Sequence, residues 1–244
     1  MMVLLVLAGC GKKGPVQPLK QPLPAAPREL ALRQVGMRFL LAWDIPKVNQ
    51  NGSPLTDLQG FRIYRMRFDL AEDCPECRDT SVLREEIDLD YLRDATRRGD
   101  RLYFWDSEPK TGFGYKYTIV PFTRRNRDGA PAQVRRPMVV PPLPPAGLSA
   151  SGRDRMVRIQ WEPMTEDRQG VEWLGYNLYR REAGEPFPPR PLNREPLMNT
   201  SYEDFDVQNQ KTYVYALRSV VRILDTPVES PLSDPAEATP REGL

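Results

Sequence analysis

The stretch LQGFRIYR at residues 58–65 decides the fold, because its pattern occurs a second time as LGYNLYR at residues 174–180. In both copies a glycine precedes alternating apolar and polar side chains, which is the period of a β-strand that buries one face. A second alternating pattern that ends in tryptophan precedes each copy, as MRFLLAW at 37–43 and VRIQW at 157–161. The repeat therefore predicts two copies of one β-structure in tandem.

The sequence that follows each copy repeats as well. FWD at residues 104–106 is followed by YKY at 115–117, and YED at 202–204 is followed by YVY at 213–215. The spacing from the aspartate to the second tyrosine is the same in both copies. Short alternating strands separated by turn residues are typical of antiparallel sandwiches. We therefore predict an all-β protein with two tandem β-sandwiches.

Tryptophan in strand B, the glycine–aromatic motif in strand C and Tyr-x-Tyr in strand F together resemble fibronectin type III domains. The resemblance spans about residues 27–240. It implies that these aromatic side chains are core residues rather than a stacking surface for a ligand. It also implies that Tyr115 and Tyr213 each tie the corner before strand F to the backbone.

The domain organisation follows from the two copies. We expect a first fibronectin type III-like sandwich over residues 27–141 and a second over 146–240, followed by a short tail at 241–244. Proline-rich residues 142–145 lie between them, and a proline run supports neither a helix nor a sheet ladder. We expect this linker to act as a short stiff spacer.

The amino-terminal residues resemble an export signal. The apolar run of residues 1–9 ends in LAGC, residues 7–10, which resembles the lipobox of bacterial lipoproteins. The resemblance implies that residues 1–9 are a signal peptide and that Cys10 carries a covalent lipid, with no other cofactor. No Lys or Arg precedes the apolar run. Either the true start codon lies upstream or the sequence is trimmed.

Residues 10–26 are predicted to be a disordered tether behind the lipid. Residues 11–28 contain five prolines and four basic side chains but no acid, which favours an extended, unfolded chain. The lipid would anchor the protein in the cell envelope, and Gly11 in place of aspartate favours the outer membrane. CGKKGP at residues 10–15 also resembles the start of a small lipoprotein family that assists the lipopolysaccharide translocon. That resemblance implies, as an alternative, an assembly factor for outer-membrane machinery.

The first copy carries an insert that the second lacks. It contains CPEC at residues 74–77. In an oxidising periplasm a disulfide between Cys74 and Cys77 is the leading interpretation. A zinc site shared by two chains, a redox-active pair and two free thiols remain open. Downstream apolar residues at helical spacing suggest a short amphipathic helix: Ile87, Tyr91, Leu92 and Ala95.

Two segments are candidate binding surfaces. A hairpin with a predicted turn at residues 126–129 is rich in arginine, the side chain that pairs best with phosphate or carboxylate. It is either a solvated face or an anion contact for lipid A phosphates or acidic glycans. Residues 220–235 form a second candidate recognition loop. The arginines of the hairpin are Arg124, Arg125, Arg127, Arg135 and Arg136.

Composition argues against catalysis. The chain has no histidine, the side chain best suited to acid–base work near neutral pH, and lacks nucleophile-elbow and phosphate-loop motifs. Its net charge of +2 does not favour nucleic acid. We expect a non-catalytic envelope module without a metal, which binds a protein or glycan partner through its sandwich loops. A carbohydrate-active enzyme is a weaker alternative, because sequence cannot reveal a carboxylate pair among 33 acids.

Overall fold

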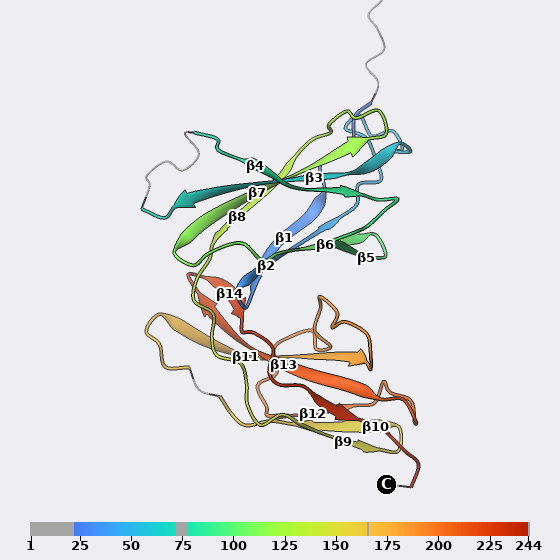
Figure 1. The fold of residues 1–244 in the computed structure, drawn as a ribbon, viewed down its shortest axis with the longest axis vertical. Coiled ribbons are helices and arrows are strands. Elements are labelled where there is room, and N and C mark those ends of the chain that lie inside the picture. Colours follow the sequence, from blue (N-terminus) through green and yellow to red (C-terminus); the bar gives the residue numbers. More distant parts are fainter. Residues whose placement is uncertain (1–21, 72–77, 165, 244) are drawn as a thin grey trace, which may run out of the picture.

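The computed structural model describes residues 22–71, 78–164 and 166–243. The predictions for Cys10, Cys74 and Cys77, for the signal peptide and for most of the tether therefore lie outside the described residues. Every regular element in the described part is a β-strand. Figure 1 shows the strands in two sandwiches stacked along the long axis.

The first sandwich contains eight strands in two sheets. One sheet has the order β1-β2-β6-β5, formed by Arg28–Val35, Arg38–Asp44, Arg101–Asp106 and Ala95–Arg98. The facing sheet has the order β4-β3-β7-β8, formed by Val82–Asp88, Leu58–Asp69, Phe113–Thr123 and Ala132–Pro137.

Alternating side chains from both sheets fill the first core, as the sequence pattern predicted. Phe39, Leu41 and Trp43 of β2 are fully buried. The Trp43 ring meets Phe61 of β3 edge to face, with 5.5 Å between ring centroids. This geometry is favourable for aromatic pairs. The repeated aromatic residues are thus core residues.

The second sandwich repeats the plan. One sheet has the order β12-β10-β9, formed by Ser201–Asp204, Met156–Gln160 and Ser149–Arg153. In the other sheet β13 pairs with three strands: β13 is Tyr213–Ile223, and its partners are β11 (Val171–Glu182), β14 (Thr226–Glu229) and β15 (Ala236–Ala238). Trp161 and Tyr176 pack edge to face at 5.4 Å, as Trp43 and Phe61 do.

Both predicted tyrosine corners are confirmed. The backbone N–H of Lys110 donates to Tyr115 Oη at 2.8 Å. The backbone N–H of Gln208 donates to Tyr213 Oη at 3.0 Å. The chain is therefore an all-β protein with two fibronectin type III-like β-sandwiches, as the sequence predicted.

One sheet continues from the first sandwich into the second. Strand β1 pairs in parallel with β14, matching Gln34 with Val228 and Val35 with Glu229. The N–H of Gly36 extends the pairing by donating to the carbonyl of Glu229 at 2.8 Å. Figure 1 shows β14 beside β1 and β2 where the sandwiches meet. The two sandwiches are thus joined by backbone hydrogen bonds as well as by the linker.

The junction explains why β2 is buried on both faces. Phe39, Leu41 and Trp43 face the core, whereas Leu40 and Ala42 join a small apolar cluster on the opposite face. The proline run between the sandwiches is partly buried as well. Pro142 and Pro145 are buried, and Ser219 Oγ donates to the carbonyl of Leu143 at 2.6 Å.

The predicted helix in the insert is wrong. Ile87 lies in β4, where it is the register partner of Phe61, and its side chain is buried. Tyr91 lies in the turn after β4 with 68% of its surface exposed, and Ala95 begins β5. Strand β3 offers a free edge to residues 82–88, and backbone pairing along that edge outweighs the helical spacing of a few apolar residues.

Candidate binding cleft at the sandwich junction

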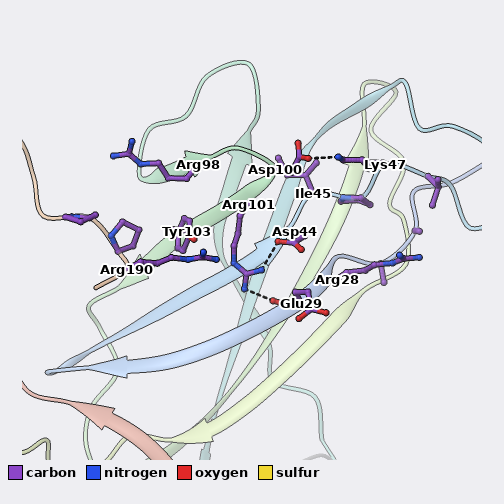
Figure 2. Close-up of a pocket in the computed structure, with 16 residues that line it drawn as sticks. Arg28, Glu29, Asp44, Ile45, Lys47, Arg98, Asp100, Arg101, Tyr103 and Arg190 are labelled. Carbon is purple, nitrogen blue, oxygen red and sulfur yellow. Dashed lines mark hydrogen bonds and ion pairs between the residues drawn. The ribbon is translucent and has the colours of Figure 1, made fainter. Parts of the chain in front are cut away.

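A cleft of about 910 Å³ opens between the first sandwich and a loop of the second. The first sandwich contributes the lining from residues 25, 26, 28, 29, 44–48, 98, 100, 101 and 103, and residues 188–190 contribute the facing wall. The volume lies in the range of ligand pockets, which occur preferentially at domain interfaces. Figure 2 shows the charged side chains around its rim.

Strand register brings the charged side chains of the cleft together. Arg28 of β1 is opposite Asp44 of β2, and Asp44 is opposite Arg101 of β6. Arg101 Nη1 donates to Asp44 at 2.7 Å, and Nη2 donates to the carbonyl of Glu29 at 2.9 Å. That carbonyl belongs to a residue at φ 50° in a register shift between β1 and β2. The guanidinium of Arg101 is therefore held in place by contacts with strands β1 and β2.

A second cation of the cleft is also neutralised. Lys47 forms an ion pair with Asp100. The hydrogen bond and the charge of Lys47 lower the pKa of the Asp100 carboxyl below its usual value. Both groups are exposed, so solvent screens the attraction and the pair contributes little to stability.

Three arginines of the cleft have no acidic partner in the part of the chain that the structure describes: Arg28, Arg98 and Arg190. All three are exposed. Arg190 lies over the ring of Tyr103 at 5.8 Å, a cation–π contact that reaches across the junction. The lining contains five cations and three acids, so its formal charge is +2.

The loop that carries Arg190 is fixed to strand β11. The N–H of Leu178 donates to Asn193 Oδ1 at 2.8 Å, and the N–H of Leu192 donates to the carbonyl of Leu178 at 2.7 Å. Arg33 Nη1 of the first sandwich donates to the carbonyl of Pro189 at 3.5 Å. The facing wall of the cleft is therefore held from both sandwiches.

A buried carboxylate fixes the two sandwiches beside the cleft. Glu229 accepts a hydrogen bond from Tyr179 Oη at 2.5 Å and pairs with Arg33 of the first sandwich. Arg218 Nε lies 3.8 Å from the same carboxylate. Burial, followed by the charge of Glu229, raises the pKa of Tyr179 far above its usual value. This network makes the junction a defined interface rather than a loose hinge.

One predicted anion-binding residue belongs to this junction instead. Arg136 is buried and donates to the carbonyls of Leu32 and Pro227 at 3.1 Å each and to Thr226 Oγ1 at 2.8 Å. Burial, and next the charge of Arg33, lower the pKa of Arg136 to about 10. The prediction of an external anion at Arg136 is wrong, because the second sandwich covers it.

The predicted recognition loop at residues 220–235 lies at the junction of the two sandwiches. Residues 220–229 form the β13–β14 hairpin, which contacts the first sandwich through β1. Ser230 and Ser233 then close the irregular stretch by accepting the N–H groups of Ser219 and Leu217 at 2.9 Å. This segment holds the sandwiches together.

The other arginines of the predicted basic hairpin lie apart from the cleft. Arg124 pairs with Asp90 at 3.2 Å. Arg125 and Arg135 are exposed and have partners of their own, and Arg127 is half-buried. The turn lies earlier than predicted, because the N–H of Asn126 donates to the carbonyl of Thr123 at 2.8 Å. No residue of the hairpin lines the cleft.

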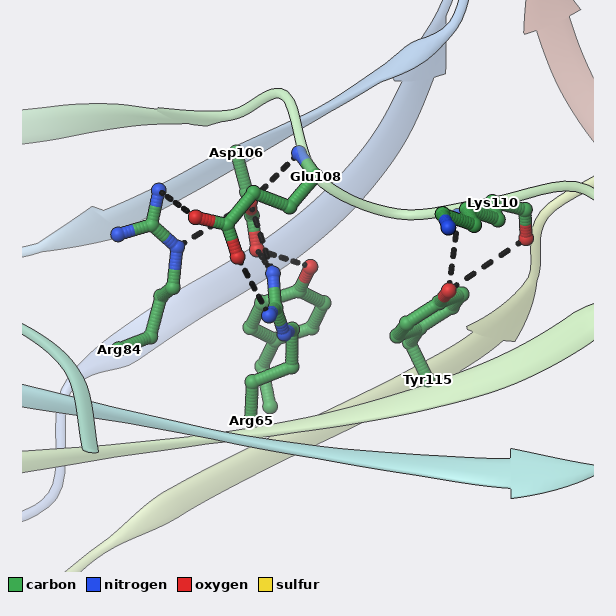
Figure 3. Close-up of polar contacts among 7 residues, drawn as sticks. Arg65, Arg84, Asp106, Glu108, Lys110 and Tyr115 are labelled. Carbon is green, nitrogen blue, oxygen red and sulfur yellow. Dashed lines mark hydrogen bonds and ion pairs between the residues drawn. The ribbon is translucent and has the colours of Figure 1, made fainter. Parts of the chain in front are cut away.

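A buried aspartate crosslinks the two sheets of each sandwich. Asp106 of β6 accepts hydrogen bonds from Tyr117 Oη and Arg65 Nη1 of the facing sheet, both at 2.8 Å. Figure 3 shows Arg65 and Arg84 directed at this carboxylate and at the neighbouring Glu108. Burial opposes ionisation of Asp106, but the hydrogen bonds from Tyr117 and Arg65 outweigh it and hold its pKa below the usual value.

The second sandwich has the same triad. Asp204 accepts from Tyr215 Oη and Arg180 Nη1, again at 2.8 Å each. The equal spacing of aspartate and tyrosine in the two sequence copies thus reflects a shared structural contact. Each carboxylate therefore accepts hydrogen bonds from side chains of its own sandwich.

The described residues contain no group of three or more Cys, Asp or Glu side chains arranged to hold a metal ion. No helix with the length and hydropathy needed to cross a membrane occurs among them.

Sequence reasoning did not find the cleft. Arg28, Arg98 and Arg190 come from segments far apart in the chain, and no local pattern marks them as neighbours. The available signals were a charged turn, RRGDR at residues 97–101, and an arginine among prolines, FPPRP at 187–191. Both stand out only once the junction is known.

No family model and no curated protein matches the chain. Among solved structures, it is similar to the FN1–FN3 domains of chicken CNTN1, with 12% identity, a TM-score of 0.36 and coverage of 90% of this chain and 69% of that one. It is also similar to a Fn3-like protein from Clostridium thermocellum, with 24% identity, a TM-score of 0.31 and coverage of 41% and 92%. A myokine structure matches with 14% identity, a TM-score of 0.32 and coverage of 41% and 99%.

Proposed function

We propose that this protein is a lipid-anchored protein of the bacterial cell envelope that acts as a non-catalytic binding module. The observation that carries the proposal is the junction, where one sheet and the Glu229 network join two sandwiches around a cationic cleft. A preformed cleft binds without the entropic cost of ordering its own walls.

The amino-terminal sequence supports the anchor. The LAGC motif at residues 7–10 has the small residues that a signal peptidase requires before the cysteine. Each methylene of an acyl chain that enters the bilayer contributes about 0.8 kcal/mol, so two or three chains hold a protein stably. A protein that binds its partner at the membrane gains from such an anchor, since both are held in a small volume.

Metabolic labelling with palmitate tests the anchor. We expect the natural protein to take up label and to fractionate with membranes, and the Cys10→Ala variant to do neither. The variant leaves the described sandwiches unchanged, so a normal β-sheet circular dichroism spectrum serves as its control. Label on the variant would show that the lipid is not on Cys10.

A turnover assay tests the absence of catalysis. We expect purified protein to leave envelope glycans and glycolipids intact over hours at stoichiometric concentration. Release of product in proportion to enzyme concentration and time would show that the protein is a carbohydrate-active enzyme rather than a non-catalytic binding module.

A second role is favoured by one observation, the resemblance of CGKKGP at residues 10–15 to lipoproteins that assist the lipopolysaccharide translocon. Under this proposal the tether, rather than the cleft, contacts the translocon. Replacing Lys12 and Lys13 by glutamine would then disrupt translocon assembly in cells while leaving both sandwiches folded. Normal assembly in that variant would remove the second role.

A further inference from the structure

We propose that the junction cleft binds an extended acidic segment of a partner protein, in which carboxylates alternate with aliphatic side chains. The inference rests on the proposed binding function and names its ligand class. It follows from the distribution of charge, from the apolar part of the lining and from the shape that these impose on a ligand.

The charges of the cleft are dispersed. Figure 2 shows Arg98 and Arg190 on one side of the cleft and Arg28 on the other, so their guanidinium groups do not converge on one point. A single phosphate or sulfate is held by donors that converge on it. Separate cations instead match separate anionic groups along an extended ligand.

Apolar side chains form the other part of the lining. They are Ala25, Ala26, Ile45, Pro46 and Val48 from the first sandwich, and Pro188 and Pro189 from the second. Aliphatic side chains bury their surface well against such a lining. A glycan carries no aliphatic side chains to bury on this lining, and the single aromatic residue of the lining, Tyr103, is buried beneath Arg190 and offers no open face for a sugar ring.

The chain does not supply this ligand itself from its amino-terminal segment. Residues 11–21 carry three lysines and no acid, so like charges disfavour that segment in a cleft of positive charge. An acidic segment of another protein is the complementary occupant.

The test measures fluorescence anisotropy with a labelled peptide, Glu-Pro-Leu repeated four times, and its matched control with glutamine in place of every glutamate. The protein is the full chain with Cys10→Ser, which removes the acylation site and leaves each cleft residue unchanged. We expect the acidic peptide to bind about ten-fold more tightly than the glutamine peptide at physiological salt. Equal affinities would overturn the proposal.

Matched variants separate the cleft from general charge. The double variant Arg98→Gln/Arg190→Gln should raise the Kd of the acidic peptide about ten-fold. The control Arg153→Gln/Arg241→Gln removes the same charge from exposed residues that do not line the cleft, and should change the Kd by no more than about two-fold. An equal loss of affinity in both double variants would show that the peptide is attracted by general charge, and would refute the cleft as its binding site.

Competitors distinguish other sources of negative charge. Displacement of the peptide by 10 mM inorganic phosphate would point to a single-anion site, and displacement by phosphatidylglycerol vesicles would point to a lipid surface; either result overturns the peptide proposal. The acidic peptide could fail to bind while palmitate still labels Cys10 of the natural protein and an envelope partner still crosslinks to another surface. That result would overturn the acidic-peptide proposal and leave the proposed binding function standing.

Discussion

Replacing Asp106 by asparagine removes the charge that joins the two sheets of the first sandwich and keeps the shape of the side chain. Arg65 and Arg84 would lose their buried anion, and both side chains are mostly buried, with 17% and 24% exposed. Breaking a buried ion pair from one side costs about 3–5 kcal/mol. Both arginines keep Glu108 as a partner, which reduces the loss. We therefore expect Asp106→Asn to lower the free energy of unfolding by about 2–3 kcal/mol.

Equilibrium urea denaturation at pH 7 measures this loss. Asp204→Asn should cost a similar amount, because Asp204 makes the same contacts with Arg180 and Tyr215. The control is Glu203→Gln, which breaks the exposed pair with Arg158 and should cost less than about 1 kcal/mol. If Asp106→Asn is no more costly than Glu203→Gln, the crosslink between sheets contributes nothing and the argument fails.

The same carboxylate predicts a pH dependence. The pKa of Asp106 is lower in the folded protein than its usual value near 3.9. Its contribution is therefore fully present above about pH 4 and is lost as the pH falls through the folded pKa. Unfolding midpoints between pH 5 and 2 should fall more steeply for the natural protein than for Asp106→Asn. Parallel curves would show that Asp106 is not the titrating group.

Three further outcomes are expected. Tyr115→Phe and Tyr213→Phe should each cost about 0.5–1.5 kcal/mol in urea denaturation, because each removes one corner hydrogen bond; no loss in either would discount the corners. Arg136→Met should lower the thermal unfolding midpoint and expose the linker to protease, since three acceptors at the junction lose their donor. An unchanged rate of cleavage would show that the hydrogen bonds of Arg136 do not hold the junction closed. Cys74 and Cys77 should resist alkylation until reduced, and reduction should barely move the global midpoint, since a short disulfide loop removes little unfolded-state entropy; two alkylated thiols by mass spectrometry before reduction would reject the disulfide.

The cores of the sandwiches could be predicted because their signal is local. Trp43, Phe61 and Tyr117 lie in patterns of period two that recur in the second copy, and burial of one strand face dictates that period. The tyrosine corners followed from the resemblance that those patterns established. These features depend on residues that are close in sequence or related by the repeat.

The junction could not be predicted, because the hydrogen bonds that join the two sandwiches connect residues from 90 to 196 positions apart. Arg136 follows a strand pattern that gives no sign of the second sandwich, and it bonds to Thr226 and Pro227. The local sequence around an arginine does not show whether another domain buries its side chain. Glu229 shows the same difficulty, since only the fold places it opposite Arg33 and Tyr179.

The helix expected near Ile87 failed for a related reason. Apolar residues at i, i+4 and i+5 also occur where a strand, a turn and a second strand succeed one another. Strand β4 pairs with β3 along its free edge, and β5 pairs with β6 in a hairpin. Tertiary pairing therefore decided the local structure.

Photocrosslinking in cells that produce the protein tests whether the junction cleft is its binding surface. A photoreactive amino acid would replace Arg98 in the cleft or, as control, Arg153 on β9 in the second sandwich. We predict a defined protein adduct in the membrane fraction from position 98, weakened by Arg190→Gln and absent from position 153. Equal adducts from both positions, or none from position 98 in a protein that is acylated and folded, would contradict the claim that this cleft is the binding surface of an anchored module.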